Sequence, residues 1–499
     1  MRGQLTIAVG LGCLGLALWT ALAGVSSDAA AEPRPRTPLP DVSAFGPESA
    51  DVPEPAIDPV EPVLPRSLPP PVPSTPPEPE TKRAPDDAGQ RSRTVPSELL
   101  ARIPVPLPAI GATGLPRLVA AGQTGTRKAR NERVVELVKR GAGATPLRVE
   151  YTLDLELTQT IYDIFERGRV SLGLAVVLDP ATGKVLAYAG TDPKRLPAGE
   201  VYPAASLVKV ITAAATLESA PDAVRRGCRY VGNPYRLTPA RVVPPNRGTE
   251  ITFERAIAMS NNQCFAQLAV NELGAKRILD EFGRFGLLQR PGAGHEAGQA
   301  ADPLDDRFAL GKLGCGLAGL QITALHAAEI AATLVDGNRR APRWIERVTD
   351  TNGQPFALPP IAAPVRVLRA PLAANLRELM IATTVSGTAR RAFHAAYGRP
   401  LLREMSVAGK TGSLSGKTPP GRYEWFIGLA PADRPKVAIA VLVVQQKRWH
   451  TTGSQIGAQI LNAIFCSGGI CRVERADQWL TADLETPAAA AAPATQRLY

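Results

Sequence analysis

The stretch LGLAVVLDPATGKVLAYA, residues 172–189, contains two apolar runs separated by a turn. The runs are rich in Val, Leu and Ala, and the Asp-Pro-Ala-Thr-Gly between them is typical of a chain reversal, so the stretch predicts a β-hairpin. Two more apolar runs, 423–429 and 437–444, have the pattern of neighbouring antiparallel strands. The sequence therefore predicts one antiparallel sheet to which both ends of the folded region contribute.

Helices are predicted around and between these strands. Asp154 precedes a segment that extends to about Gly168 and is a suitable N-cap for it. The other predicted elements are a strand over 147–153 and helices over 204–218, 252–273 and 456–465. The predicted fold class is α+β, with an antiparallel sheet flanked by helices and an all-helical subdomain.

Length and proline content divide the chain of 499 residues. A single domain seldom exceeds about 250–300 residues, and 22 of the 48 prolines lie between Pro33 and Pro108. Such sequence favours an extended tether over packed structure. The predicted parts are a signal peptide or membrane anchor (1–27), a Pro-rich disordered linker (28–125), a short helical lead-in (126–145, with one basic helix over 127–140), a folded domain (146–475) and a disordered tail (476–499).

The N-terminal segment indicates export. Residues 5–25 carry no charge and would span about 30 Å as a helix, the thickness of the bilayer core. Ala21-Leu22-Ala23 also has the small-residue pattern of a signal-peptidase site. A retained anchor and a cleaved signal both remain open, whereas a buried core helix fits poorly before a proline-rich segment.

The net charge of +11 indicates which kinds of partner the protein could bind, and it does not indicate the fold. Nucleic acid and an anionic membrane or cell-wall polymer are the candidate partners. The basic residues are scattered and aromatic residues make up only 5% of the chain, which leaves few stacking surfaces for single strands. We therefore expect no nucleic-acid binding.

A Ser-x-x-Lys sequence, Ser206 to Lys209, opens the predicted helix over 204–218. Residues three apart share a helix face, so Lys209 should stand beside Ser206. A serine hydroxyl needs a base to become a good nucleophile, and a lysine serves as that base when burial or nearby cations lower its pKa. Alone, the pattern is weak, because a serine cap followed by a lysine is common.

Two further short sequences, at residues 260–262 and 410–413, offer polar groups that could act together with Ser206 and Lys209. Ser260-Asn261-Asn262, just inside the predicted helix over 252–273, offers a hydroxyl to relay a proton and, at Asn262, an amide to hold a lysine or a substrate amide. Lys410-Thr411-Gly412-Ser413 follows a predicted strand end. It offers a cation, two hydroxyls and room at Gly412 for a substrate backbone, which together form a seat for a carboxylate. Taken singly, each is also explained by an ordinary turn.

Together, in this order, the three sequences resemble the motifs of the penicillin-binding proteins, the serine D,D-transpeptidase and β-lactamase superfamily. The resemblance covers about residues 145–470 and includes TLDLELTQTI (152–161) and GCGLAGLQITALHAAEIAATLVDGNRRAP (314–342). It implies the transpeptidase form of the α+β fold. It also implies that Ser206 is the acylated nucleophile, that Lys209 activates it, and that Ser260 and Asn262 relay protons and orient substrate.

The resemblance further implies that Lys410, Thr411, Gly412 and Ser413 bind the substrate carboxylate, and that the backbone N–H groups of Ser206 and Ser413 form the oxyanion hole. The implied reaction is attack on a D-Ala-D-Ala peptide bond of a peptidoglycan stem peptide, followed by transfer to an amine or to water. β-Lactam antibiotics would acylate Ser206. No metal or organic cofactor is implied, and the four histidines are scattered with no HExxH pattern.

Several alternatives remain open. A D,D-carboxypeptidase differs only in its acyl acceptor. A β-lactamase needs a group that activates water, and no Glu-x-x-x-Asn pattern lies between Ser260 and Lys410. A non-catalytic β-lactam sensor would keep the pocket without turnover. Expected partners are the inner membrane, through the N-terminal segment, and cell-wall synthesis proteins. The expected location is the periplasmic face of the cell envelope, either tethered or secreted.

The chain has six cysteines, and an exported location permits disulfide bonds. Cys466 and Cys471 are predicted to close a small loop, and a zinc pair is the other interpretation. Cys228 and Cys264 form a second candidate pair. Cys13 and Cys315 are expected to be unpaired, with Cys315 buried.

Overall fold

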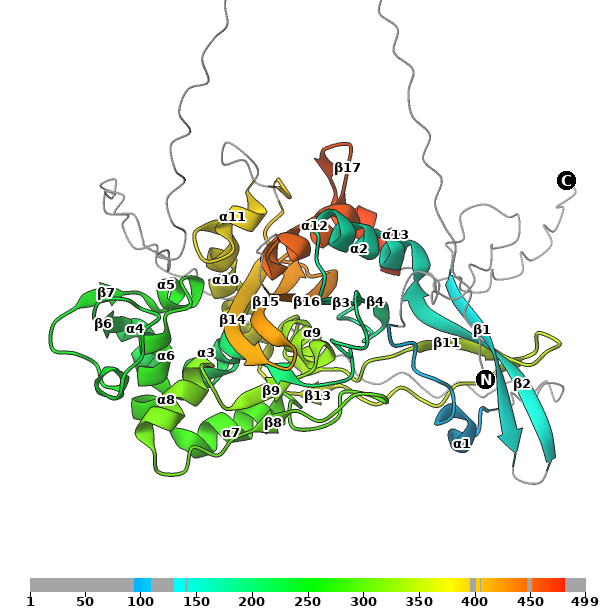
Figure 1. Ribbon diagram of the computed structural model, residues 1–499, viewed down its shortest axis with the longest axis horizontal. Coiled ribbons are helices and arrows are strands. Elements are labelled where there is room, and N and C mark those ends of the chain that lie inside the picture. Colours follow the sequence, from blue (N-terminus) through cyan, green and yellow to red (C-terminus); the bar gives the residue numbers. More distant parts are fainter. Residues whose placement is uncertain are drawn as a thin grey trace, which may run out of the picture. The chain divides into compact units, whose positions relative to one another are not determined.

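Five antiparallel strands form the central sheet of the protein, in the order β14-β15-β16-β3-β4 (Figure 1). Their bounds are β14 Ala408–Lys417, β15 Pro420–Ala430, β16 Val437–Gln445, β3 Gly173–Leu178 and β4 Val185–Gly190. Val441 of β16 lies opposite both Phe426 of β15 and Ala175 of β3. The N-terminal hairpin and the C-terminal strands thus join in one sheet, which confirms the predicted α+β class.

The structure, a computed structural model, describes residues 94–108, 130–139, 142–394, 401–403, 405–446 and 451–480, and between 130 and 145 it describes the backbone alone. The predicted signal or anchor over 1–27, most of the linker and residues 481–499 lie outside the described residues. Among the residues described, every helix is too short or too polar to cross a bilayer.

Helices cover both faces of the sheet (Figure 1). Helices α2 (Leu155–Arg167) and α12 (Gly453–Phe465) pack on one face through a core that includes Ile161, Phe426 and Ile460. Helix α9 (Ala324–Thr333) packs on the other. The central strands β3 and β16 are buried throughout, as expected of apolar runs that are covered on both sides.

The ends of these helices follow from local chemistry. The Asp154 carboxylate accepts a hydrogen bond from the Leu157 N–H at 2.9 Å and begins α2, as predicted. Thr452 and Gln455 form a capping box at the start of α12. Each cap satisfies backbone N–H groups that would otherwise lack partners.

A helical subdomain is inserted between β4 and β14 and lies to one side of the sheet (Figure 1). Its helices are α3 Val208–Ser219, α4 Pro221–Arg226, α5 Phe253–Ala258, α6 Asn262–Leu268, α7 Gly274–Arg284 and α8 Arg307–Cys315. Helix α10 (Ala370–Val385) contacts both α5 and β14. The subdomain and the sheet therefore share an edge at β14.

A second sheet has the order β1-β2-β11-β12. Its strands are β1 Arg130–Lys139, β2 Ala142–Asp154, β11 Ile345–Thr349 and β12 Pro355–Phe356. The smaller strands are β5 Tyr202–Pro203, β6 Cys228–Tyr230, β7 Thr249–Ile251, β8 Gln299–Ala300, β9 Leu320–Ile322, β10 Asn338–Arg339, β13 Val365–Arg366, β17 Cys466–Ser467 and β18 Ile470–Cys471.

The helix predicted over 127–140 is wrong. Residues 130–139 form strand β1, which pairs antiparallel with β2. The sequence RNERVVELVK has apolar residues at 134, 135, 137 and 138, a spacing that suits either a helix or a strand. Pairing with β2 decides between them, because it supplies backbone partners that a short isolated helix lacks.

The predicted disordered linker over 28–125 is also wrong in part. Residues 94–108 include helix α1 (Ser97–Leu100), and Val95, Leu99 and Ile103 are buried in the main core. The predicted tail over 476–499 likewise begins with an ordered turn, α13 (Asp477–Leu480). The amino-acid composition does not indicate that residues 94–108 and 477–480 are ordered, because each segment is ordered by packing on the rest of the domain.

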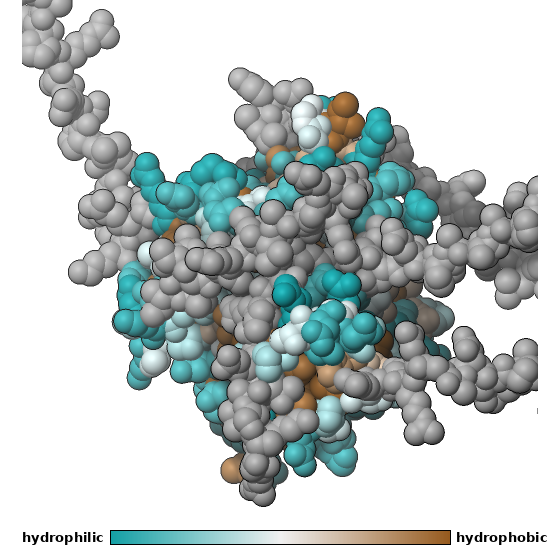
Figure 2. Space-filling model, turned by 90° about the vertical axis from the view of Figure 1, so that its right-hand side faces the viewer, coloured by the Kyte–Doolittle hydropathy of each residue, from teal (hydrophilic) through white to brown (hydrophobic). Residues whose placement is uncertain are grey.

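Both candidate cysteine pairs are disulfide bonds, Cys466–Cys471 and Cys228–Cys264, and Cys315 is free and buried. The face shown in Figure 2 is mostly hydrophilic where residues are described, with small separate apolar areas.

Candidate active site

Ser206 lies at the start of the helix that was predicted over 204–218. The helix begins as a 3-10 turn, η3 (Ala205–Leu207), and continues as α3. Ala205 has a φ of +49°, a conformation that costs a non-glycine residue energy and that is typical of functional sites. The Ser206 side chain is half-buried, while Lys209 one turn later is buried.

Lys209 contacts three oxygen atoms. Its Nζ lies 2.8 Å from the Ser206 Oγ, 2.7 Å from the Asn262 Oδ1 and 2.7 Å from the Cys315 carbonyl oxygen. None of the three is a carboxylate. Burial lowers the pKa of the Lys209 ammonium to about 8. A lysine in this setting is in part neutral near neutral pH and can accept a proton from the serine beside it.

The residues around Ser260 correct the predicted helix over 252–273. The chain forms α5, then a turn, then α6 and a π-helical segment, η5 (Ala269–Leu273). Ser260 sits in the turn with a φ of +56°, and the Asn261 side chain caps α6 by accepting from the Cys264 N–H at 3.1 Å. An Asn N-cap competes with a continuous helix. The break leaves the Ser260 hydroxyl outside the helix.

Asn262, the first residue of α6, uses both ends of its amide. Its Oδ1 accepts from Lys209, and its Nδ2 donates to the Tyr235 carbonyl oxygen at 2.8 Å. The backbone N–H of Asn262 also donates to the Pro234 carbonyl oxygen at 3.0 Å. The amide is therefore held in one orientation by a loop far from it in sequence, with its oxygen toward Lys209.

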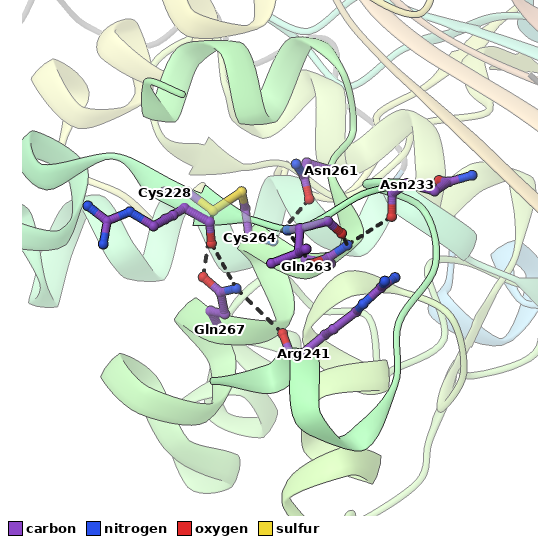
Figure 3. Close-up of a disulfide and its surroundings, with 9 residues drawn as sticks. Cys228, Asn233, Arg241, Asn261, Gln263, Cys264 and Gln267 are labelled. Atoms are coloured by element: carbon purple, nitrogen blue, oxygen red, sulfur yellow. Dashed lines mark hydrogen bonds between the residues drawn. A yellow bond between two sulfur atoms is a disulfide. The ribbon is translucent and has the colours of Figure 1, made fainter. Parts of the chain in front are cut away.

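Figure 3 shows how that loop is attached to α6. The Cys228–Cys264 disulfide joins strand β6 to α6. The Gln263 side chain donates to the Asn233 carbonyl oxygen at 2.8 Å, and Gln267 donates to the Arg229 carbonyl oxygen at 3.2 Å. The disulfide and these hydrogen bonds hold residues 228–241 against the helix that carries Asn262.

Lys410, on β14, is fully buried. Its Nζ donates to the Ser260 Oγ and to the Thr411 carbonyl oxygen, each at 2.8 Å. Burial, and after it the charge of Lys209, holds the pKa of Lys410 well below its usual value. The structure places Lys410 as a bridge between β14 and the Ser260 turn. Its expected role in binding a carboxylate stays a prediction.

The rest of the β14 sequence lies beside Ser206. A Cβ at Gly412 would lie 3.3 Å from the Ser206 backbone nitrogen, so the strand passes the nucleophile closely. Thr411 is half-buried and Ser413 is exposed. The structure therefore brings all three predicted sequences together: Ser206 with Lys209, Ser260 with Asn262, and the strand from Lys410 to Ser413.

Several groups that support the site leave little or no signal in the sequence. Thr388, in the turn after α10, has its hydroxyl 2.5 Å from that of Thr411. The Cys315 carbonyl and the Tyr235 carbonyl hold Lys209 and Asn262. Backbone carbonyls leave no signal in a sequence. The only signal near Cys315 is the glycine on either side of it.

A family model of the penicillin binding protein transpeptidase domain matches residues 173–466. A peptidoglycan D,D-transpeptidase, PbpA of Mycolicibacterium smegmatis, is 27% identical over 365 residues, which are 64% of this chain and 72% of the relative. The crystal structure of PBPA from Mycobacterium tuberculosis aligns with a TM-score of 0.53 and 23% identity, and covers 66% of this chain and 89% of its own.

An imipenem acyl-enzyme complex of penicillin-binding protein A from Mycobacterium tuberculosis also aligns, with a TM-score of 0.53 and 26% identity. It covers 63% of this chain and 79% of its own. The matched region, 173–466, contains the residues that the geometry brings together.

Proposed function

The chain belongs to the penicillin-binding protein transpeptidase family, and we propose that it is a serine D,D-transpeptidase that acts on the D-Ala-D-Ala stem peptides of peptidoglycan. The relative PbpA carries the activity in its name, and a structural neighbour holds a β-lactam as an acyl-enzyme. The observation that supports the assignment in this chain is the 2.8 Å separation of the Lys209 Nζ and the Ser206 Oγ.

In the first half of the reaction, neutral Lys209 takes the proton of the Ser206 hydroxyl. The Oγ then attacks the carbonyl carbon of the D-Ala-D-Ala peptide bond, and the backbone N–H groups of Ser206 and Ser413 stabilise the oxyanion. The C–N bond breaks, and the terminal D-Ala leaves with a proton that passes from Lys209 by way of Ser260. The acyl group remains on Ser206.

In the second half, an amine of another stem peptide attacks the ester carbonyl carbon and forms a new C–N bond. The bond from that carbon to the Ser206 Oγ breaks, and the proton that the amine loses returns the Oγ to a hydroxyl. Asn262 orients Lys209 and the substrate amide. Lys410, Thr411, Gly412 and Ser413 hold the terminal carboxylate. A β-lactam follows the first half only: its ring amide opens, but the leaving nitrogen stays attached and blocks the acceptor.

A D,D-carboxypeptidase, a β-lactamase and a non-catalytic β-lactam sensor are the competing functions. With purified enzyme and stem peptides, cross-linked product supports the transpeptidase, and D-Ala release without cross-links supports the carboxypeptidase. Rapid loss of free penicillin indicates the β-lactamase. Acylation at one equivalent with neither product indicates the sensor.

The assignment is tested by labelling with a tagged penicillin and mapping the modified residue by mass spectrometry. We expect one label, on Ser206, and we expect Lys209→Ala to abolish labelling while the protein stays folded by circular dichroism. Lys276→Ala is the matched control, because that side chain is 88% exposed on α7. Labelling at another residue would overturn the assignment of Ser206, and rapid labelling of Lys209→Ala would remove Lys209 as the base.

We also place the enzyme in the cell envelope, on the periplasmic face of the inner membrane. The support is the uncharged run over residues 5–25 and the similarity to a peptidoglycan D,D-transpeptidase. Deletion of residues 1–27 should abolish the recovery of the protein with membranes after cell fractionation. Unchanged membrane recovery would point to attachment through cell-wall synthesis proteins instead.

A further inference from the structure

We propose that Arg422 is a positioning residue for the terminal carboxylate of the substrate, acting through the hydroxyl of Ser413. The inference rests on the proposed function and names a further residue of the same site. Arg422 lies outside the three motif sequences, nine residues after Ser413 and on the neighbouring strand β15.

The register of the sheet brings the two side chains together. Ser413 of β14 lies directly opposite Glu424 of β15, and Arg422 precedes Glu424 by two residues. Side chains two apart on a strand share a face, so Arg422 is the diagonal cross-strand neighbour of Ser413. Its Nε donates to the Ser413 Oγ at 2.6 Å, a short charge-assisted contact.

This contact limits what the Ser413 hydroxyl can do. A serine hydroxyl has a single hydrogen and accepts through its oxygen lone pairs. With Arg422 donating to the oxygen, that hydrogen is left to donate elsewhere. The bond to a cation also polarises the hydroxyl and makes it a better donor. A substrate carboxylate, which only accepts, is the matching partner.

The charge of Arg422 also suits a role at the carboxylate seat. The other cation of the carboxylate seat, Lys410, is fully buried and donates to Ser260, and burial and Lys209 lower its pKa. Arginine side chains in proteins carry a positive charge. The Arg422 side chain is about half-exposed, at 48%. Its positive charge lies next to the Ser413 Oγ and polarises that hydroxyl independently of Lys410.

Glu424 places the guanidinium. Its carboxylate lies 3.3 Å from the Arg422 Nε and its side chain is 9% exposed. Burial raises the pKa of Glu424, and the charge of Arg422 and a hydrogen bond with Gln445 oppose that shift. Glu424 is therefore placed to hold the Arg422 guanidinium beside the Ser413 hydroxyl.

The experiment compares the acylation rate constants for benzylpenicillin, which has a free carboxylate, and for its methyl ester, which has none. We expect Arg422→Gln to lower the benzylpenicillin value about tenfold and to leave the ester value unchanged. Arg422→Lys should restore most of the loss, because an ammonium both donates and carries charge. Arg434→Gln is the matched control: that side chain is 82% exposed beyond the other end of β15, and we expect no change for either compound.

A double-variant cycle tests whether Arg422 acts through Ser413. If it does, Arg422→Gln combined with Ser413→Ala should be no slower with benzylpenicillin than Ser413→Ala alone. Equal losses for the acid and the ester, no loss for either, or fully additive losses would each overturn the inference. Absence of acylation in the unsubstituted enzyme is a different result, because it would overturn the proposed function and this inference with it.

Discussion

Lys209 and Lys410 are both fully buried, and their bonding partners are hydroxyl, amide and carbonyl oxygens. Burying an ammonium without a carboxylate disfavours the charged form. The two lysines also repel each other, which lowers the pKa of Lys410 further. The protein thus holds two amines in an environment that favours proton transfer over simple ion pairing, a pattern that marks functional sites.

The pKa of Lys209 predicts how acylation depends on pH. Below about 8 the amine is protonated and cannot take the Ser206 proton, whereas above about 8 it is neutral. The acylation rate constant for benzylpenicillin should therefore rise about tenfold per pH unit up to about pH 8 and then level off. Stopped-flow measurements from pH 6 to pH 9.5 test this, and a flat profile would show that Lys209 is not the base.

At the scale of elements, the site is assembled from ends and turns. Ser206 lies in the turn before α3, Ser260 in the break between α5 and α6, and the Cys315 carbonyl at the end of α8. Strand β14 is the fourth segment that contributes to the site. Backbone groups at such ends lack partners within their own helix, so they are available to hold side chains such as Lys209.

Gly316 shows how closely the end of α8 packs against the turn that carries Ser206. It caps α8 with a φ of +74°, and an added Cβ would lie 1.9 Å from the Ala205 carbonyl oxygen. We expect Gly316→Ala to lower the free energy of unfolding by about 2–3 kcal/mol and to slow acylation at least tenfold, because Ser206 and Cys315 must both move. Chemical denaturation and penicillin labelling measure the two effects.

Gly353 is the matched control for this substitution. It has a φ of +80° and open space around the position of a Cβ. Gly353→Ala should cost about 1 kcal/mol from the backbone alone and leave acylation unchanged. If Gly316→Ala behaved in the same way, the close approach to Ala205 would have no role in the site.

The Cys228–Cys264 disulfide supports another of these ends. It closes a separation of 36 residues and anchors the loop that holds Asn262. A cross-link of this span contributes about 3–4 kcal/mol in the chain-entropy model. The variant Cys228→Ala/Cys264→Ala should lose stability of that order by calorimetry and acylate more slowly. Removing Cys466 and Cys471, which are five residues apart, is the control, and we expect acylation to stay normal.

At the scale of the whole molecule, segments far apart in sequence share one core. Val95 donates its backbone N–H to the Ala357 carbonyl oxygen at 2.9 Å, and the Tyr151 hydroxyl donates to the Pro104 carbonyl oxygen at 2.8 Å. Ile103 is 6% exposed in the main core. The end of the proline-rich region is therefore part of the folded domain.

This packing predicts a stability effect. Ile103→Ala should lower the free energy of unfolding by about 2–4 kcal/mol through lost burial and the cavity left behind. Ile361→Ala removes the same atoms from a residue that is 62% exposed and should change stability by less than about 0.5 kcal/mol. Urea denaturation measures both changes. If Ile103→Ala and Ile361→Ala lowered the free energy of unfolding by the same small amount, residues 94–108 would not pack on the core in solution.

The antiparallel sheet, its flanking helices and the three polar sequences follow from the sequence alone, because strand and helix periodicity and the spacing of Ser206 and Lys209 are local properties. The wrong predictions have a common cause, which is that the structure of the segment depends on partners distant in the chain. This holds for β1, for the turn at Ser260 and for residues 94–108. The same holds for the bond from Lys410 to Ser260 and for Arg422 beside Ser413. The tertiary structure alone decides which oxygen atoms bond to the buried amines of Lys209 and Lys410. Those contacts depend on the register of the strands and on where the helices end.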